Sequence, residues 1–377
     1  MALLDILVAI LETIVPFVAM FALLVGVHEW GHFRMARYLG ISCTQFSIGV
    51  GRVLWSMTDR DGCEWQLRAI PLGGFVRFLG DRDATSVAPD GAGSALSPDE
   101  KRRRLLYRSP LDRALVLAAG PAANIALGLV VLAALYSGYG RPMVPPVIQS
   151  VIPGAPADVA GLRQGDRITS INGMRTDSFG DIYSEIALHP DEPVLVVYRR
   201  EGVEQPVEAE ITPKGVKVVT FGSAQTVGRI GITSGSAINQ PTGPIDAVAL
   251  GFWDVAKQTR AFIITLGQLL SGNRSIDDVG SPIRMASIAK NAAADGLSSW
   301  TFMLAVFSIN LAVVNLLPLP VLDGGQLVLC AIEGAMRRPM KPQVMVYVQI
   351  FGACLLLTIM TVLTLNDLWT LIRSMAV

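Results

Sequence analysis

Charged residues are scarce in this sequence. Only 16% of its 377 residues are Asp, Glu, Lys or Arg, whereas 51% are hydrophobic. This balance excludes an ordinary soluble globular protein and indicates a membrane protein. The 31 basic and 31 acidic residues give a formal net charge of zero. We therefore expect no nucleic-acid partner, because phosphate binding needs a basic surface.

Cysteine and histidine are also rare. The four cysteines, Cys43, Cys63, Cys330 and Cys354, are scattered and show no paired metal-ligand spacing. They indicate neither a disulfide framework nor a cysteine zinc site. Only three histidines occur, and two of them, His28 and His32, lie four positions apart within the stretch HEWGH.

Long apolar runs, in contrast, are abundant. Four of them, near residues 6–30, 113–137, 299–319 and 343–365, are long enough to cross a bilayer as helices, which takes about 20 residues. The first run begins MALLDILVAILETIVPF and lacks the basic start and small-residue cleavage site of a signal peptide, so we expect it to be retained. The sequence predicts a polytopic α-helical membrane protein with four transmembrane helices.

Basic residues beside these runs predict the orientation of the chain. Arg34 and Arg37 follow the first run, and KRRR at 101–104 precedes the second. Lysine and arginine favour the cytoplasmic side of a membrane. We therefore expect a multi-pass protein of the bacterial inner membrane. Both termini and the segment from about 138 to 298 would lie in the periplasm.

The outer segment begins with a soluble module. The stretch VIQSVIPGAPADVAGLRQGDRITSINGMRT at 147–176 resembles the PDZ domains of bacterial proteases. The resemblance implies one inserted PDZ (α+β) domain at 138–215, since no second AGLxxGD pattern occurs. PDZ domains bind an extended peptide as an added strand. The carboxylate-binding loop could be 138–142 or 227–232, so peptide binding and simple steric exclusion both remain open.

The next segment, 216–298, is expected to be a periplasmic linker. It contains a helix-like stretch from Pro244 to Gly272 with an apolar face. This amphipathic helix would lie on the membrane surface or pack against its own protein.

A β-hairpin is predicted between the first two membrane helices, at 44–79. The stretch RVLWSMTDRDGCEWQLRAIPLGGFVRF alternates apolar and polar residues on both sides of DRDG, which is typical of a hairpin. Apolar flanks such as Trp55 and Ile70 suggest a sheet that dips into the bilayer or packs on the helices; an ordinary cytoplasmic hairpin is the alternative. The predicted membrane domains are residues 1–137 and 299–377.

The motif HEWGH lies at the end of the first apolar run. On an α-helix, His28 and His32 project from one face and can bind the same metal ion. In zinc hydrolases with this pattern the histidines are ligands, and the glutamate, here Glu29, accepts a proton from water whose acidity the ion raises. Ionisable side chains at membrane depth are costly and indicate a functional site. The motif therefore predicts one catalytic zinc ion.

A third ligand is expected from NLLPLPVLDGGQ at 315–326. Pro318 and Pro320 interrupt the helix, and the glycines after Asp323 release the chain. Asp323 alone could be a helix cap. However, the first and third membrane helices end on the same side, which brings Asp323 to the depth of the two histidines and favours a ligand.

Taken together, HEWGH, GPAAN at 120–124, the PDZ-like module and NLLPLPVLDGG resemble the site-2 protease family, in particular its regulator-of-sigma-E type members. The resemblance covers nearly the whole chain, although several relatives carry two PDZ domains. It implies an intramembrane zinc endopeptidase with the ligands His28, His32 and Asp323, the general base Glu29 and the substrate-positioning residue Asn315. Gly120, Pro121, Asn124 and Pro318 are interpreted as mainly structural residues near the site.

Such an enzyme would perform regulated intramembrane proteolysis of single-span membrane proteins. A substrate of this kind is an anti-sigma factor already shortened by an upstream periplasmic protease. An edge strand formed by Gly73, Gly74, Phe75 and Val76 could accept the unwound substrate as an extra strand. The other expected partner is membrane lipid. A membrane zinc transporter and a catalytically inactive PDZ adaptor are the alternatives.

Overall fold

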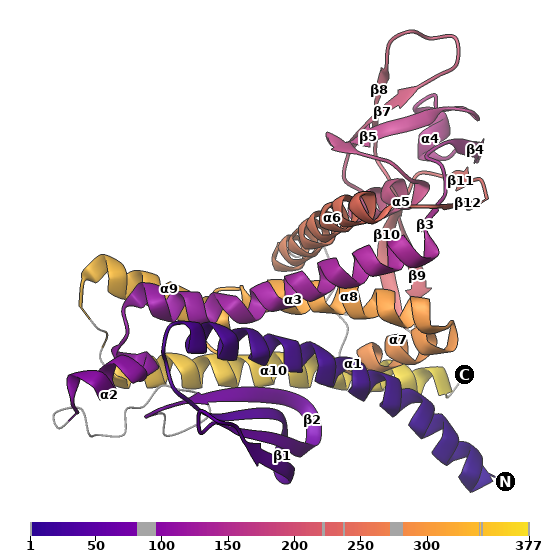
Figure 1. The fold of residues 1–377 in the computed structure, drawn as a ribbon. Coiled ribbons are helices and arrows are strands. Elements are labelled where there is room, and N and C mark those ends of the chain that lie inside the picture. The colour runs from indigo at the N-terminus through magenta and orange to yellow at the C-terminus, as the bar shows by residue number, and fades with distance from the viewer. Residues whose placement is uncertain are drawn as a thin grey trace. The chain divides into compact units, whose positions relative to one another are not determined.

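The chain folds into two compact units, which are described separately. The structure is a computed structural model and describes residues 2–80, 96–220, 223–236, 238–271, 282–338, 340 and 342–375 (Figure 1). The first unit comprises Met1–Leu132 and Met285–Val362, and the second comprises Ala133–Arg284 and Leu363–Val377. Parts of the predicted linker at 216–298, including the expected end of its helix at residue 272, lie outside the described residues.

The first unit is built mainly from helices. Four helices of the chain are long and apolar enough to cross a membrane, over Leu11–Tyr38, Pro110–Tyr139, Leu297–Asn315 and Gln343–Leu368. They correspond to the four predicted spans, and the chain is a membrane protein. The elements assigned to this unit are α1 (Ala2–Tyr38), β1 (Cys43–Thr58), β2 (Glu64–Phe78), α2 (Pro98–Arg103), the 3-10 turn η1 (Leu105–Tyr107), most of α3 (Pro110–Tyr139), most of α7 (Pro282–Ala294), α8 (Leu297–Asn315), α9 (Asp323–Met336) and most of α10 (Pro342–Met375).

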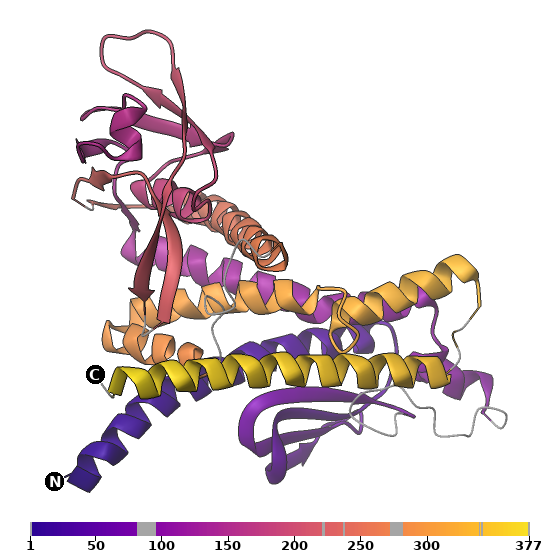
Figure 2. The same ribbon diagram turned by 180° about the vertical axis from the view of Figure 1, so that it is seen from behind.

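The third membrane helix is shorter than expected. The sequence suggested that it reaches residue 319, but α8 ends at Asn315. Pro318 and Pro320 cannot donate backbone hydrogen bonds, so they cannot continue the helix. The chain instead turns through residues 316–322 and begins a further helix, α9 (Figure 2).

Two apolar clusters hold α1 in the first unit. Toward its middle, Met20 and Leu24 are buried with Leu304 of α8. Toward its end, Phe33 forms aromatic contacts with Phe46 and Trp65 of the hairpin, at ring-centroid distances of 5.5 and 5.1 Å. These contacts fix the part of α1 that carries the HEWGH motif between another membrane helix and the hairpin.

The hairpin folds back on itself. The first part of β1 pairs with the end of β2, for example Phe46 with Val76, and also with the beginning of β2, where Phe46 pairs with Trp65. The second part of β1 pairs only with the beginning of β2. The segment 74–78 therefore has one recorded strand neighbour within the described residues, which makes it an edge strand. The expected turn is present, and its Asp59 carboxylate accepts hydrogen bonds from the backbone N–H groups of Asp61 and Cys63.

The second unit carries most of the short strands. Its four-stranded antiparallel sheet has the order β6-β5-β7-β8, and α5 packs its apolar face on the same core through Ile182 and Ile186. The elements are β3 (Arg141–Met143), β4 (Ile148–Val151), α4 (Pro156–Val159), β5 (Arg167–Ile171), β6 (Met174–Arg175), α5 (Phe179–Ala187), β7 (Val194–Arg199), β8 (Val207–Ile211), β9 (Lys214–Thr220), β10 (Ser223–Arg229), β11 (Ile232–Ser234), β12 (Ile238–Gln240) and α6 (Pro244–Leu270).

Strand pairing in this unit extends beyond the module boundary expected at residue 215. β11 pairs with β4, so Ile232 lies opposite Val151. Ile230, just before β11, is buried in the core that contains Ile168 of β5. The folded module therefore includes residues up to about Ser234, because β4 has its pairing partner β11 there.

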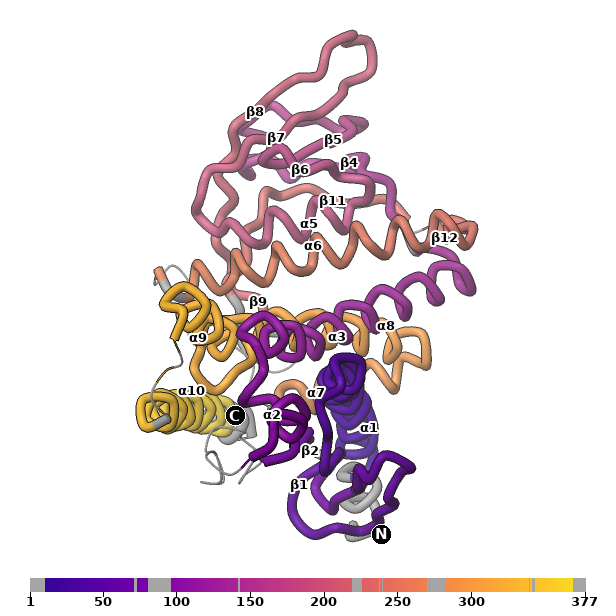
Figure 3. Tube along the Cα trace, turned by 60° about the vertical axis from the view of Figure 1, so that its left-hand side comes forward, coloured from indigo at the N-terminus to yellow at the C-terminus, as the bar shows by residue number. Residues whose placement is uncertain are grey.

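Ion pairs join α6 to α5 in the second unit, where the two helices run side by side (Figure 3). Lys257 Nζ lies 2.9 Å from Asp181 Oδ1. Arg260 Nη2 donates to Glu185 Oε1 at 3.0 Å, and its Nη1 also bonds this carboxylate. The predicted amphipathic helix is thus packed by its polar residues against its own protein.

Candidate metal centre

Helix α1 holds His28 and His32 on one face. Residues four apart are neighbours on a helix surface. The two Nε2 atoms lie 3.1 Å apart, and both residues are buried. The first part of the site therefore follows from helix geometry alone.

The turn between α8 and α9 brings Asp323 to the histidines. A Cβ atom on Gly324 would lie 2.3 Å from the Leu316 carbonyl oxygen, and one on Gly325 would lie 2.1 Å from that of Leu319. These two glycines thus allow the turn to fold directly onto the start of α9. Asp323 is the first residue of α9, whose N-cap is Leu322 and has no side-chain cap bond.

The donor atoms of the three side chains lie close enough together to share one zinc ion. Asp323 Oδ2 lies 3.1 Å from His28 Nε2 and 3.5 Å from His32 Nε2. Donor atoms held by a tetrahedral zinc ion at about 2.0–2.2 Å lie roughly 3.3–3.6 Å from one another. Asp323 Oδ2 is buried and has no hydrogen-bond partner. Two imidazoles and a carboxylate that converge around an unsatisfied oxygen fit the donor set of a catalytic zinc.

Within the part of the chain that the structure describes, this is the one group of three His, Cys, Asp or Glu side chains close enough to share a metal ion. Glu29 lies beside it, against strand β2. A Cβ atom on Gly74 would come within 2.9 Å of Glu29 Cγ and within 2.8 Å of the Ser47 carbonyl oxygen. Glycine at this position therefore allows the edge strand to run directly over the glutamate.

Helix α3 covers the other side of the two histidines. His32 Nδ1 lies 2.8 Å from the backbone oxygen of Val116, and Asn124 Nδ2 lies 3.4 Å from His28 Nδ1. Between them, a Cβ atom on Gly120 would lie 2.3 Å from His32 Nε2. Gly31 similarly allows α1 to lie close to α3. A Cβ atom at this position would lie 2.3 Å from the Ala119 carbonyl oxygen.

The remaining predicted site residues surround this cluster less closely. Asn315 ends α8 and is partly exposed, and Pro318 is exposed in the turn that follows. Phe75 has the guanidinium groups of Arg68 and Arg77 near its ring, at 5.1 and 5.7 Å from the ring centroid. Gly73 lies in β2 with φ +135°, directly before the paired segment 74–78. Val76, within that segment, and Pro121, inside α3, are buried.

Val116 is a contributor that the sequence analysis missed. It acts through its backbone oxygen, which no side-chain motif reveals. The available signal was spacing, since residues 116, 120 and 124 recur every four positions and share one face of a helix. The spacing alone does not show which element packs against this face of α3; the structure shows that it is the two histidines.

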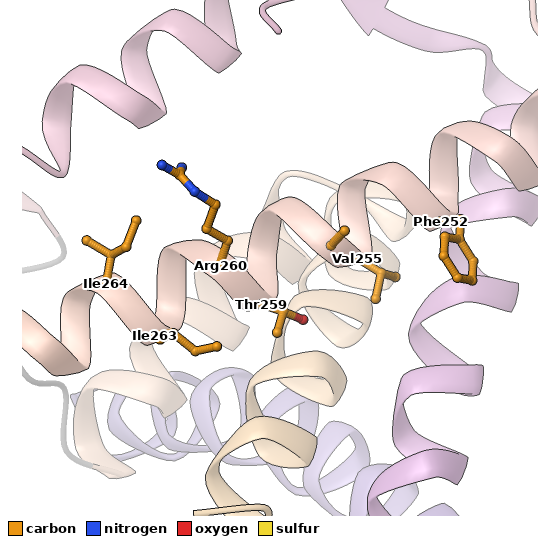
Figure 4. A pocket seen from close by; sticks show the side chains of 7 residues that line it. Phe252, Val255, Thr259, Arg260, Ile263 and Ile264 are labelled. Atoms are coloured by element: carbon orange, nitrogen blue, oxygen red, sulfur yellow. The ribbon is translucent and has the colours of Figure 1, made fainter. Parts of the chain in front are cut away.

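A separate hollow of about 460 Å³ lies along α6 (Figure 4). Its lining is mostly apolar and includes Phe252, Val255 and Ile263. Arg260 is its one charged lining residue and is already paired with Glu185. The hollow therefore offers no group for acid–base or metal chemistry.

Comparison with known proteins supports the chemistry of the metal centre. A protein of Agrobacterium fabrum that is named as a zinc metalloprotease is 36% identical over 368 residues, which cover 95% of this chain and 96% of that protein. The zinc metalloprotease RasP of Geobacillus kaustophilus is 30% identical, with coverage of 95% and 98%. The protease eep of Enterococcus faecalis is 27% identical, with coverage of 95% and 99%.

Among solved structures, the PDZ domain of an SdrC-like protein from Listeria monocytogenes is 25% identical and covers 23% of this chain and 84% of its own. Its TM-score of 0.19 is too low to establish a shared fold. The family evidence is broader, because the model of Peptidase family M50 matches residues 16–359. The predicted resemblance to site-2 proteases is thereby confirmed: the chain belongs to Peptidase family M50 and is a zinc metalloprotease.

Proposed function

We propose that this protein is an intramembrane endopeptidase that cuts single-span membrane proteins within or near their membrane span. The observation that carries the proposal is where the three zinc-binding side chains, His28, His32 and Asp323, lie in the chain. His28 and His32 belong to a helix segment, Leu11–Tyr38, that is long and apolar enough to cross a membrane. A soluble metalloprotease would have no reason to bury its ligands in such a segment, where ionisable groups are costly.

In this proposal His28, His32 and Asp323 hold the zinc ion. A zinc ion bound there would supply Lewis acidity, which makes water more acidic and carbonyl groups more electrophilic. Glu29 accepts the proton of the attacking water at its carboxylate and can pass it to the leaving nitrogen. The position of Glu29 suits this role, because it follows His28 in the sequence and its side chain lies against the edge strand at Gly74.

The edge strand would bind the substrate. A transmembrane helix resists proteolysis because its carbonyl groups are hydrogen-bonded internally, so the substrate must first unwind. The segment Gly73–Val76 can pair with the unwound chain as an added strand, and its contact with Glu29 through Gly74 would place the scissile bond near the base. Asn315, at the end of α8, would help to position the substrate.

We further propose that the active site faces the cytoplasm and that residues 138–234 form a periplasmic PDZ domain. The basic residues Arg34, Arg37 and Lys101–Arg104 support this orientation. An anti-sigma factor shortened by an upstream periplasmic protease is a substrate of the expected class. We expect a protein with this orientation to lie in the bacterial inner membrane.

The test is Glu29→Gln, assayed in detergent with a model single-span substrate. The variant keeps the shape of the side chain and both histidines but loses the proton acceptor. We expect zinc content to stay at the wild-type level while cleavage falls roughly 10²–10⁴-fold. A chelator should abolish wild-type cleavage, and added zinc should restore it.

Glu12→Gln is the matched control, because it makes the same change on the same helix about 25 Å away. It should leave both zinc content and cleavage unchanged. Near-normal cleavage by Glu29→Gln would refute the role of Glu29, and cleavage restricted to soluble peptides would refute the intramembrane substrate.

A further inference from the structure

One face of α3 contacts both histidine rings at a regular spacing. Val116, Gly120 and Asn124 follow one another every four residues. Val116 offers its backbone oxygen to His32, Gly120 leaves room for both rings, and Asn124 reaches His28 with its amide. The sequence analysis interpreted this segment as structural packing, but these contacts fall on the ring atoms that decide which nitrogen can bind a metal.

At His32 the contact determines the tautomer. A backbone carbonyl oxygen can only accept a hydrogen bond, so the Nδ1 atom 2.8 Å from Val116 must carry the proton. In a neutral imidazole this leaves the lone pair on Nε2. That atom is directed toward Asp323, 3.5 Å away, as a metal ligand requires.

At His28 the tautomer depends on the orientation of one amide. Asn124 is fully buried, and its Nδ2 lies 3.4 Å from His28 Nδ1, whereas its Oδ1 has no hydrogen-bond partner. With Nδ2 as donor, the His28 proton would sit on Nε2 and prevent that atom from binding a metal. A half-turn of the amide exchanges two groups of nearly equal size, so it needs no extra space. Oδ1 then accepts from Nδ1–H, and Nε2 is free.

We propose that Asn124 is a positioning residue whose Oδ1 accepts the Nδ1 proton of His28 and thereby directs the His28 Nε2 lone pair toward the metal. The inference deepens the proposed function, since it rests on His28 as a ligand. It also gives the otherwise unsatisfied, buried Oδ1 a partner. Metal-binding histidines usually donate their second N–H to such an acceptor, which fixes the ring and tautomer.

Helix α8 holds Asn124 in place for this task. Ser308 is fully buried, and its Oγ donates to the Asn124 backbone oxygen at 2.8 Å. The amide is therefore attached to a backbone position fixed by two helices.

The test compares three substitutions in the full-length protein purified in detergent. Asn124→Asp keeps an acceptor of the same shape, Asn124→Leu keeps the volume without an acceptor, and Asn124→Ala removes both. Zinc affinity is measured by competition with a chromogenic chelator. We expect Leu and Ala to weaken zinc binding by about 10–100-fold, the usual effect of losing such a partner, and Asp to restore affinity close to wild type.

The absorption spectrum of the cobalt(II)-substituted protein supplies an independent readout. The Asp variant should keep the tetrahedral spectrum of wild type, whereas Leu and Ala should alter it. Leu132→Ala is the control for a merely structural loss, because Leu132 is buried on the same helix about 12 Å further along. It should reduce the thermal stability of the metal-free protein without changing zinc affinity.

Wild-type zinc affinity in both the Leu and Ala variants would overturn the inference, and so would an Asp variant as weak as these two. Should Leu not fold, the comparison of Ala with Asp decides in the same way. A failure of the proposed function gives a different result: Glu29→Gln would then retain activity, whatever the zinc affinities of the Asn124 variants.

Discussion

Gly120 lies so close to the metal centre that any side chain there would occupy the space of the histidine rings. A Cβ atom would come within 2.3 Å of His32 Nε2 and 2.9 Å of His28 Cε1. Gly120→Ala should therefore displace both rings and reduce zinc binding at least tenfold, an effect of the size seen when a ligand's orientation is lost. Inductively coupled plasma mass spectrometry of the purified protein measures the zinc content.

Gly138→Ala is the control for this substitution. It lies on the same helix, and a Cβ atom there would meet nothing within 4 Å. It should leave zinc content unchanged and slightly favour the helix, since alanine has the higher helix propensity. Equal zinc contents in the two variants would contradict the close packing of α3 on the histidines.

Substitution of Asp323 distinguishes its role as a metal ligand from that of a carboxylate at the start of a helix. Asp323→Ala should lower zinc content together with activity, because a two-histidine site lacks the usual three protein ligands. Asp112→Ala makes the same change in the first turn of α3 and should leave both unchanged. Full zinc and full activity in Asp323→Ala would mean that the carboxylate only lies favourably at a helix start.

At the scale of elements, the contact between α5 and α6 should depend on pH. Burial raises the pKa of Glu185, but hydrogen bonds from His189 and Arg260 outweigh it and lower the pKa to about 2. A hydrogen bond to Glu185 raises the pKa of His189 above its ordinary 6.5. The stability that ionised Glu185 contributes to the folded protein is thus complete above its ordinary pKa of 4.5 and is lost as the pH falls toward 2.

The stability contributed by protonated His189 depends on pH in the opposite direction. It is complete below pH 6.5 and is lost as the pH rises through the raised pKa of His189. We therefore expect the C-terminal end of α5, together with its contact to α6, to be most stable between about pH 4.5 and 6.5, which hydrogen exchange corrected for the intrinsic rate can measure. Glu185→Gln should reduce this dependence but not abolish it, because Lys257 of α6 also lowers the pKa of Asp181 against the effect of burial. An unchanged pH profile in that variant would assign the dependence to other groups.

The elements themselves were largely predictable, and their ends were not. Alternation around DRDG indicated the hairpin because a strand exposes successive side chains to opposite faces. It did not reveal that Phe46 pairs with both Val76 and Trp65, because this depends on how the long strands fold back. The early end of α8 at Asn315 depends on the two prolines that follow, whose effect reaches back into the preceding turn.

At the scale of the whole molecule, the proposed periplasmic module can act as a filter or as a docking site. A membrane about 30 Å thick separates it from the cytoplasmic side in this topology, so it takes no part in the chemistry. Deletion of residues 146–234 should leave zinc binding and cleavage of short substrates intact, while untrimmed substrates become cleavable. The deletion must reach Ser234, because removal of β4 alone would leave β11 unpaired.

A docking role predicts a different result for the same deletion. Loss of a binding groove for a newly exposed carboxylate would slow cleavage of the trimmed substrate. Trimmed and full-length substrates compared in the same membranes distinguish the two roles. We expect faster cleavage of the full-length form, which supports the filter; slower cleavage of the trimmed form would contradict it.

The sequence by itself determined the features that depend on neighbours along the chain. His28 and His32 share a face because a helix repeats every 3.6 residues, and the membrane spans follow from local apolar composition. The tertiary structure decided what depends on distant segments: the approach of Asp323 through the turn over Gly324 and Gly325, and the contact of Asn124 with His28. The physical reason is that side-chain spacing within one helix is fixed by backbone geometry, whereas the distance between helices is set by packing, here by glycines that allow close approach.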